Sequence, residues 1–206
     1  MNTPSASKII ATLLMAFIVV KIQAQFISTN DVSIQTFTAI RKGKIVGWLK
    51  TMISQNGEEK SLTIDSKLTI SIVISFEAKA TTVNKFKGNT LIQAGVYRTL
   101  NGKEKLDNQI QLTDGRYRVN KGEAKQVVDK SIRHTVASIY FLEPVGVTEV
   151  FSEVYLQFMP LKYIGASVYV SELPDGGTMT YAYKLGKLTS ITASTSYGTV
   201  LFQLNQ

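Results

Sequence analysis

The stretch Leu68-Thr69-Ile70-Ser71-Ile72-Val73-Ile74-Ser75-Phe76 places a large apolar residue at every even position. Three of the four odd positions hold Thr or Ser. Successive side chains of a β-strand point to opposite faces, so this period of two predicts a strand with one buried and one polar-facing side. Weaker alternation on both sides extends the predicted strand to about residues 61–82. A strand of that length is typical of a strongly curved sheet or a barrel.

Turn-forming dipeptides divide the rest of the chain into shorter segments of the same kind. Asn56-Gly57, Asn101-Gly102 and Asp114-Gly115 favour the positive φ angles of tight hairpin turns. The segments between such turns are rich in Val, Ile, Thr, Tyr and Phe, which suit a pleated, half-buried surface. The further strands that we predict lie at residues 32–40, 45–55, 90–100, 105–113, 116–120, 162–173, 178–184, 188–194 and 199–204.

Consecutive strands joined by short turns predict an antiparallel meander. The predicted fold class is all-β, with a single antiparallel, strongly curved sheet or open barrel of about ten strands. Residues 135–143 contain no turn residue and precede Pro144. Proline disfavours a helical conformation in the residue before it, so we predict a short helix that ends there. Residues 145–160 are aromatic-rich and irregular, and we expect them to pack on the sheet as a connection.

The first 24 residues have the pattern of a cleavable secretory signal. Lys8 supplies positive charge, residues 9–20 are an apolar run, and Ala24 is a small residue at the predicted cleavage site. The run is shorter than the about 20 residues that span a bilayer as a helix. An uncleaved anchor or a buried helix is the alternative. Residues 25–206 are then one all-β domain, and the predicted location is the periplasm.

Composition excludes several classes of site. The chain has no cysteine, hence no disulfide and no lipid on an N-terminal cysteine, and its single histidine excludes a zinc site of His and Cys ligands. The net charge is +8 at pH 7, but the basic residues lie mostly in turns. Nucleic-acid binders more often cluster them on one face among aromatic residues, so we expect no nucleic-acid partner.

No catalytic constellation is visible in the sequence. Nucleophilic catalysis needs a base beside the nucleophile, and His134 is the only histidine. The glycines lie in turns, without the pattern of a phosphate-binding loop, and no Asp-rich calcium loop occurs. We therefore predict a protein that is not an enzyme and has no cofactor.

Aromatic and acidic side chains are the candidates for ligand binding. Glu143, Glu149 and Glu153 lie in an aromatic setting, which can raise a carboxyl pKa, and paired carboxylates could hydrolyse a glycan. The alternative is that Glu143 accepts hydrogen bonds at a turn and Glu153 pairs with a lysine. Trp48 is either a core residue or a platform on the concave side of the sheet. The candidate ligand-binding residues are Trp48, Tyr140, Glu143, Phe151, Glu153 and Tyr155.

A resemblance to a known family is carried by the stretches Gly43-Lys44-Ile45-Val46-Gly47, Ser138-Ile139-Tyr140-Phe141-Leu142-Glu143-Pro144, Val150-Phe151-Ser152-Glu153, Leu173-Pro174-Asp175-Gly176 and Tyr181-Ala182-Tyr183-Lys184. They resemble a family of uncharacterised exported proteins of the Bacteroidota. The resemblance spans most of the chain after the signal and is most specific from Ser138 onward. It implies a periplasmic, β-rich domain of unknown function and adds no activity. The family pattern implies a glycine after Tyr155, where this chain has Leu156.

Three functions fit these observations. The first is a non-enzymatic binder that holds an apolar or amphipathic envelope molecule, lipid-like or glycan, against the concave face under a cap of residues 135–160. The second is a structural or protein-interaction module of the envelope. The third is a glycan-acting hydrolase that uses Glu143 or Glu153. An outer-membrane barrel is disfavoured, because apolar bands are not sustained over the about 9–11 residues that each strand would need.

Overall fold

The structure, a computed structural model, describes residues 31–71, 75–121, 124–196 and 198–205. The predicted signal at residues 1–24 lies outside the described residues, as do residues 72–74 of the alternating stretch. Within the described ranges, no helix has the length and hydropathy to cross a membrane. The described elements are β1 (Asp31–Arg41), β2 (Lys44–Asn56), β3 (Glu59–Ser71), β4 (Ser75–Lys87), β5 (Thr90–Leu100), β6 (Lys103–Thr113), β7 (Arg116–Lys121), β8 (Ala124–Val128), η1 (Ser138–Tyr140), β9 (Glu149–Ser152), β10 (Gln157–Pro160), β11 (Lys162–Gly165), β12 (Val168–Glu172), β13 (Thr178–Lys184), β14 (Lys187–Thr195) and β15 (Gly198–Leu204).

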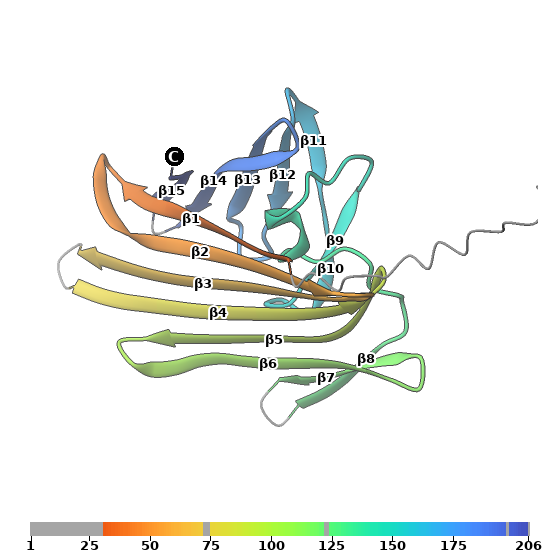
Figure 1. The fold of residues 1–206 in the computed structure, drawn as a ribbon. Helices are drawn as coiled ribbons and strands as arrows, with labels where there is room; N and C mark the ends of the chain where they lie inside the picture. The colour runs from red at the N-terminus through yellow and green to blue at the C-terminus, as the bar shows by residue number, and fades with distance from the viewer. Residues whose placement is uncertain (1–30, 72–74, 122–123, 197, 206) are drawn as a thin grey trace, which may run out of the picture.

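Thirteen of the strands form one curved sheet in the order β11-β12-β13-β14-β15-β1-β2-β3-β4-β5-β6-β7-β8 (Figure 1). Every pairing is antiparallel, and β1 and β15 join the two halves, with Phe37 opposite Leu204. The end strands β8 and β11 do not pair with each other, so the sheet stays open. The predicted all-β, antiparallel open barrel is confirmed, although it has more strands than the ten predicted.

Two of the additional strands come from hairpins at places where the sequence predicts a single strand. The single strand predicted at residues 61–82 is wrong, because β3 and β4 pair with each other up to Ser71 opposite Ser75. The strand predicted at residues 162–173 is likewise the β11–β12 hairpin. Its turn residues Ala166 and Ser167 adopt φ angles of 49° and 56°. Glycine and asparagine usually occupy such positions, so neither residue marks a turn.

The short helix predicted at residues 135–143 is reduced to one 3₁₀ turn, η1. The Ser138 hydroxyl donates to the Thr135 carbonyl at 2.8 Å and accepts from the Thr135 N–H at 3.0 Å. The Ser138 N–H also reaches the Thr135 hydroxyl at 3.0 Å. Local side-chain bonds of this kind compete with a continuous helix. The region predicted to be irregular contains the β9–β10 hairpin, with Phe151 opposite Phe158.

Residues 129–161, which we call the plug, lie against the inner face of the curved sheet (Figure 1). Backbone bonds attach them to it, with Leu91 N–H donating to the Ile132 carbonyl at 3.0 Å. Inside the plug, the Val136 N–H donates a 2.9 Å hydrogen bond to the Phe151 carbonyl, which holds η1 beside β9. The plug supplies buried side chains to both clusters of the core. The buried plug residues in these clusters are Ile132, Ala137, Ile139, Tyr140, Val150, Phe151, Leu156 and Leu161.

Candidate functional site

Polar side chains occupy inward positions on three neighbouring strands. Asn84 on β4 shares its face with Phe86, and Asn108 on β6 shares its face with Ile110; all four side chains are buried. On β5, Arg98 continues the inward series of Ala94 and Val96. A polar group buried without a hydrogen bond is costly, so these side chains identify the part of the inner face that makes specific contacts.

Glu153, at the end of the β9 arm of the plug, is the centre of a buried polar cluster. It is 2% exposed, and its Oε1 accepts from Asn84 Nδ2 at 2.6 Å and from the Ala137 N–H at 3.1 Å. Asn84 Nδ2 also donates to Thr135 Oγ1 at 2.8 Å. Burial raises the pKa of Glu153, and the hydrogen bonds to its carboxyl oppose that rise. Asn108 Nδ2 donates to the carbonyls of Glu153 and Val154, both at 2.9 Å.

This cluster fixes the plug to the sheet. Each of the two asparagines joins a sheet strand to two groups of residues 135–154. Hydrogen bonds to a charged group contribute about 1.5–3 kcal/mol each, more than neutral ones. Because Glu153 is buried, its carboxyl group does not face a cleft. The predicted pairing with a lysine is replaced by bonds to amides.

Arg98 lies beside this cluster, on the inner face but exposed to solvent. The groups whose charges act on its guanidinium are Tyr140, Tyr155, Glu153 and Asp175. Desolvation lowers the pKa of Arg98, while these groups raise it. Within the described part of the chain, no carboxylate pairs with Arg98.

Small residues border Arg98 on the adjacent strand and the one beyond it. Ala80 lies directly opposite it on β4, and Ser66 lies opposite Ala80 on β3. On the plug side, the Tyr155 hydroxyl donates to Asp175 Oδ2 at 2.9 Å, which connects the plug to the β12–β13 turn. Burial and this bond raise the pKa of Tyr155 to about 12, so the phenol remains a donor at neutral pH.

The inner face continues beyond Arg98 as an apolar surface that is only half-buried. Figure 1 shows that β2 to β5 extend past η1 and the β9–β10 hairpin on the left of the view. We call the inward side chains of that part the open inner face. They are Ser66, Leu68, Ala78, Ala80, Arg98 and Leu100, all half-buried except Arg98, which is exposed.

The six residues predicted from the sequence to bind a ligand lie in different parts of the structure. Tyr140, Glu153 and Tyr155 are among the groups whose charges act on Arg98. Phe151 is a core residue whose ring meets Phe158 edge-on at 5.3 Å. Trp48 alternates with the buried Leu49, so it lies on the outer face, 42% exposed, and not on the concave side.

Glu143 lies at a different place, at the rim of the sheet near β11 and β12. Its Oε1 accepts from the Tyr169 hydroxyl at 3.2 Å. A cavity of about 460 Å³ adjoins it, lined also by Val145, Leu161 and Tyr163. Because Glu153 is buried in the polar cluster, Glu143 and Glu153 do not form a carboxylate pair across one cleft.

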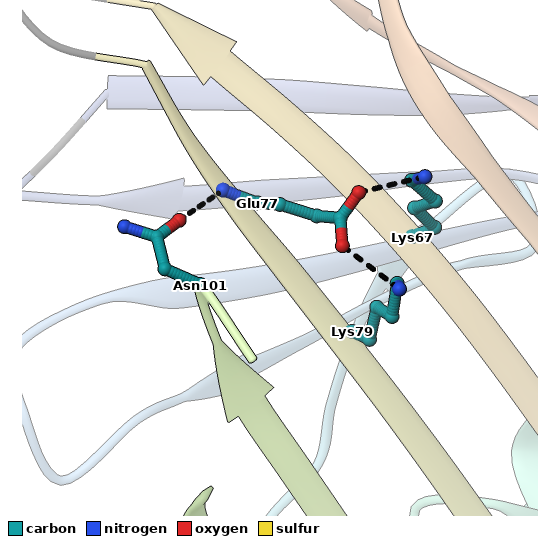
Figure 2. A network of polar contacts seen from close by, with 4 residues as sticks. All are labelled: Lys67, Glu77, Lys79 and Asn101. Atoms are coloured by element: carbon teal, nitrogen blue, oxygen red, sulfur yellow. Dashed lines mark hydrogen bonds and ion pairs between the residues drawn. The ribbon is translucent and has the colours of Figure 1, made fainter. Parts of the chain in front are cut away.

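The outer face carries a charged cluster that is fully paired, shown in Figure 2. Glu77 accepts from Lys67 at 2.7 Å and from Lys79 at 2.8 Å. These two bonds lower the pKa of Glu77 from 4.5 to about 2. The Asn101 side chain accepts from the Glu77 N–H at 2.8 Å and ties the cluster to the β5–β6 turn. Each of its charged side chains has an ion-pair partner, in contrast to Arg98.

A family model for a domain of unknown function, DUF6134, matches residues 37–205. The chain belongs to this family. Among solved structures, a β-barrel-like protein of the DUF1849 domain of unknown function from Brucella abortus is similar. The TM-score is 0.51 at 11% identity, over 85% of this chain and 95% of the other. This likeness shows the fold alone. The comparison with curated proteins gives no match.

These comparisons confirm the sequence-based assignment to an uncharacterised β-rich family. Neither description names an enzymatic activity. The resemblance implies a glycine after Tyr155, and the backbone of this DUF6134 domain has a positive φ angle at that position. Leu156 has a φ of 58°, in the left-handed region that favours glycine. The chain therefore keeps that geometry with a buried leucine.

Four residues of the candidate site were missed from the sequence: Asn84, Arg98, Asn108 and Asp175. The first three had a usable signal, because each stands at an inward position of an otherwise apolar alternation, such as Ala94, Val96 and Arg98. Asp175 had no such signal, since it belongs to a turn. In the described ranges, no three acidic or histidine side chains gather as a metal site would need.

Proposed function

We propose that this protein binds an amphipathic molecule with an anionic group on the open inner face, without catalysing a reaction. Arg98 is the observation that carries the proposal. Arg98 is exposed on the inner face and has no carboxylate pair among the described residues. The half-buried Leu100 follows it on the same face of β5, and Leu68 lies in the same row as Leu100 on β3. A fixed cation beside apolar side chains is complementary to an acidic head group with a hydrocarbon tail.

The chemistry of arginine supports an anion at this place. A guanidinium presents a planar fork of donors that binds carboxylate or phosphate through two parallel bonds. Partial desolvation strengthens such a contact relative to bulk water. Ala80 and Ser66 leave room on the strand side, and the Tyr155 hydroxyl lies on the plug side. The plug packs against the rest of the concave face, so we place the ligand on the open inner face only.

The sequence supports the periplasm as the place of action. Residues 1–24 have the pattern of a secretory signal, and the chain lacks cysteine. We propose that the domain is exported and that its ligand is a lipid-like component of the cell envelope.

Calorimetric titration of the purified protein with dodecyl phosphate and with dodecanol tests the binding proposal. We expect dodecyl phosphate to bind at least about tenfold more tightly, because a charge-assisted bidentate contact exceeds a neutral one by about 1.4 kcal/mol or more. Arg98→Met should abolish this preference, whereas the control Arg118→Met, on the exposed surface of β7, should keep it. Equal affinities for the two probes, or an unchanged preference in Arg98→Met, would overturn the proposal.

The outer face favours a second function, as a protein-interaction module. Val32, Ile34 and Trp48 expose 55%, 52% and 42% of their surface on β1 and β2. Val32 and Ile34 are neighbours on one face of β1, and Trp48 lies on the same face opposite Thr38, four residues further along. Exposed apolar groups that gather on one face are typical of interaction sites. Chemical cross-linking in envelope extract tests this alternative, because the double substitution Ile34→Ser and Trp48→Ser should remove a captured partner that Arg98→Met retains.

A further inference from the structure

The cavity beside Glu143 combines three features that the open inner face does not use. It has a volume of about 460 Å³ and lies between the loop of residues 143–148 and strands β11 and β12. Glu143 lines one wall, and the ring of Tyr163, 63% exposed, lines another. Val145, Val147 and Leu161 supply the aliphatic part of the lining.

Glu143 carries a negative charge that nothing in the described part of the chain neutralises. The ion pairs among the described residues do not include it. Among the described residues, its side-chain partner is the Tyr169 hydroxyl, a neutral donor, at 3.2 Å. Burial and the bond to Glu143 raise the pKa of Tyr169, which keeps this hydroxyl protonated at neutral pH.

The two tyrosines are held in a fixed arrangement. The ring centroids of Tyr163 and Tyr169 are 5.3 Å apart at 52°, and Tyr169 meets Tyr183 edge-on at 5.6 Å. Tyr169 is buried, so it orients Glu143 and supports Tyr163, whose ring remains accessible. The face of an aromatic ring is electronegative and attracts cations.

We infer that this cavity binds a small organic cation, an amine or a quaternary ammonium, between the Glu143 carboxylate and the ring of Tyr163. A carboxylate beside an aromatic face and aliphatic walls matches an ammonium group that carries alkyl substituents. A divalent metal ion fits poorly, because calcium takes six to eight oxygen ligands and no group of three candidate ligands occurs in the described ranges. The site is separate from Arg98 and does not depend on the function proposed for it.

Titration of the full-length protein with choline and with its uncharged isostere 3,3-dimethylbutan-1-ol, followed by NMR chemical shifts, tests this inference. We expect choline to bind at least about fivefold more tightly than the isostere, as one charge contact plus one cation–π contact would give. Glu143→Gln should remove this preference. Tyr163→Leu should weaken choline binding about fivefold.

Matched controls separate the site from general effects. Glu104→Gln and Tyr97→Leu alter an exposed acid and an exposed tyrosine on β6 and β5, and both should bind choline as the unmodified protein does. Circular dichroism verifies that each variant is folded. Equal binding of choline and the isostere, unchanged choline affinity in Glu143→Gln, or no shift with choline at all would overturn the inference. Dodecyl phosphate binding should be unaffected by Glu143→Gln, so the two proposals can fail separately.

Discussion

Lys67 and Lys79 lie opposite each other on β3 and β4, and Glu77 accepts a bond from each of them (Figure 2). Like charges in directly opposed positions destabilise a sheet, so the carboxylate compensates a local repulsion. The pKa of Glu77 is about 2 in the folded chain, against 4.5 for the free group. A lowered folded pKa means that the stabilisation is present above pH 4.5 and is lost as the pH falls towards 2.

Glu77→Gln should therefore lower the melting temperature at neutral pH and have progressively less effect as the pH falls from 4.5 to 2. Thermal melts over that range measure it, at low salt because these charges are exposed to screening. Glu104→Gln, on an exposed acid without an ion pair among the described residues, serves as the control. A melting temperature that differs between Glu77→Gln and the unmodified protein by the same amount at every pH would contradict this prediction.

Glu153 titrates in the opposite sense, because burial raises its pKa from 4.5. Above pH 4.5 the unfolded chain releases this proton before the folded one does, so stability falls with rising pH. Glu153→Gln keeps an acceptor for Asn84 and the Ala137 N–H and has no proton to release. We expect it to gain stability relative to the unmodified protein as the pH rises above 4.5.

Urea unfolding at a series of pH values measures this gain. Glu153→Leu is the informative companion, because it leaves the Asn84 amide and the Ala137 N–H without their acceptor and should cost about 1–3 kcal/mol. A stability difference between Glu153→Gln and the unmodified protein that does not change with pH would show that the carboxyl keeps its ordinary titration.

At the scale of elements, the sequence predicted strands better than it predicted turns. The alternation of Leu62, Ile64 and Leu68 correctly placed one face of β3 in the core or against it. The turns between β3 and β4 and between β11 and β12 were missed. In the β11–β12 turn, Ala166 and Ser167 are not residues that typically mark a turn. The inward positions of Arg98 and Asn84 were readable from the alternation, but their partner groups in residues 135–175 were not, because they depend on the tertiary fold.

The β11–β12 turn permits a test of that explanation. Both Ala166 and Ser167 have positive φ angles, the signature of the hairpin turn that Asn-Gly occupies with least strain. The double substitution Ala166→Asn and Ser167→Gly should stabilise the protein by about 0.5–1 kcal/mol. Urea unfolding measures it. As a control, Val168→Asn with Tyr169→Gly, inside β12, should destabilise the protein. If the turn variant also destabilises the protein, the turn is not under strain.

At the scale of the whole molecule, the plug explains how an open sheet maintains one core. The cluster around Phe37 and Tyr181 and the cluster around Leu62 and Leu91 lie under different halves of the sheet. Side chains of residues 129–161 enter both, and Phe141 packs against both. In a closed barrel the two edge strands pair with each other. Here the plug packs in the interior, and the edge strands β8 and β11 do not pair with each other.

Free edges are a site of unwanted pairing with other chains, which short edge strands and charged residues limit. The edge strand β11 has only four residues, of which Tyr163 and Ile164 are exposed, and Lys162 pairs with Glu172 at 2.7 Å. Lys162→Ile should therefore promote self-association, seen as a concentration-dependent increase in sedimentation coefficient. Lys103→Ile, on the interior strand β6, should remain at the mass of the unmodified protein, because its backbone is already paired with β5. If both variants behave alike, added hydrophobicity and not the open edge controls association.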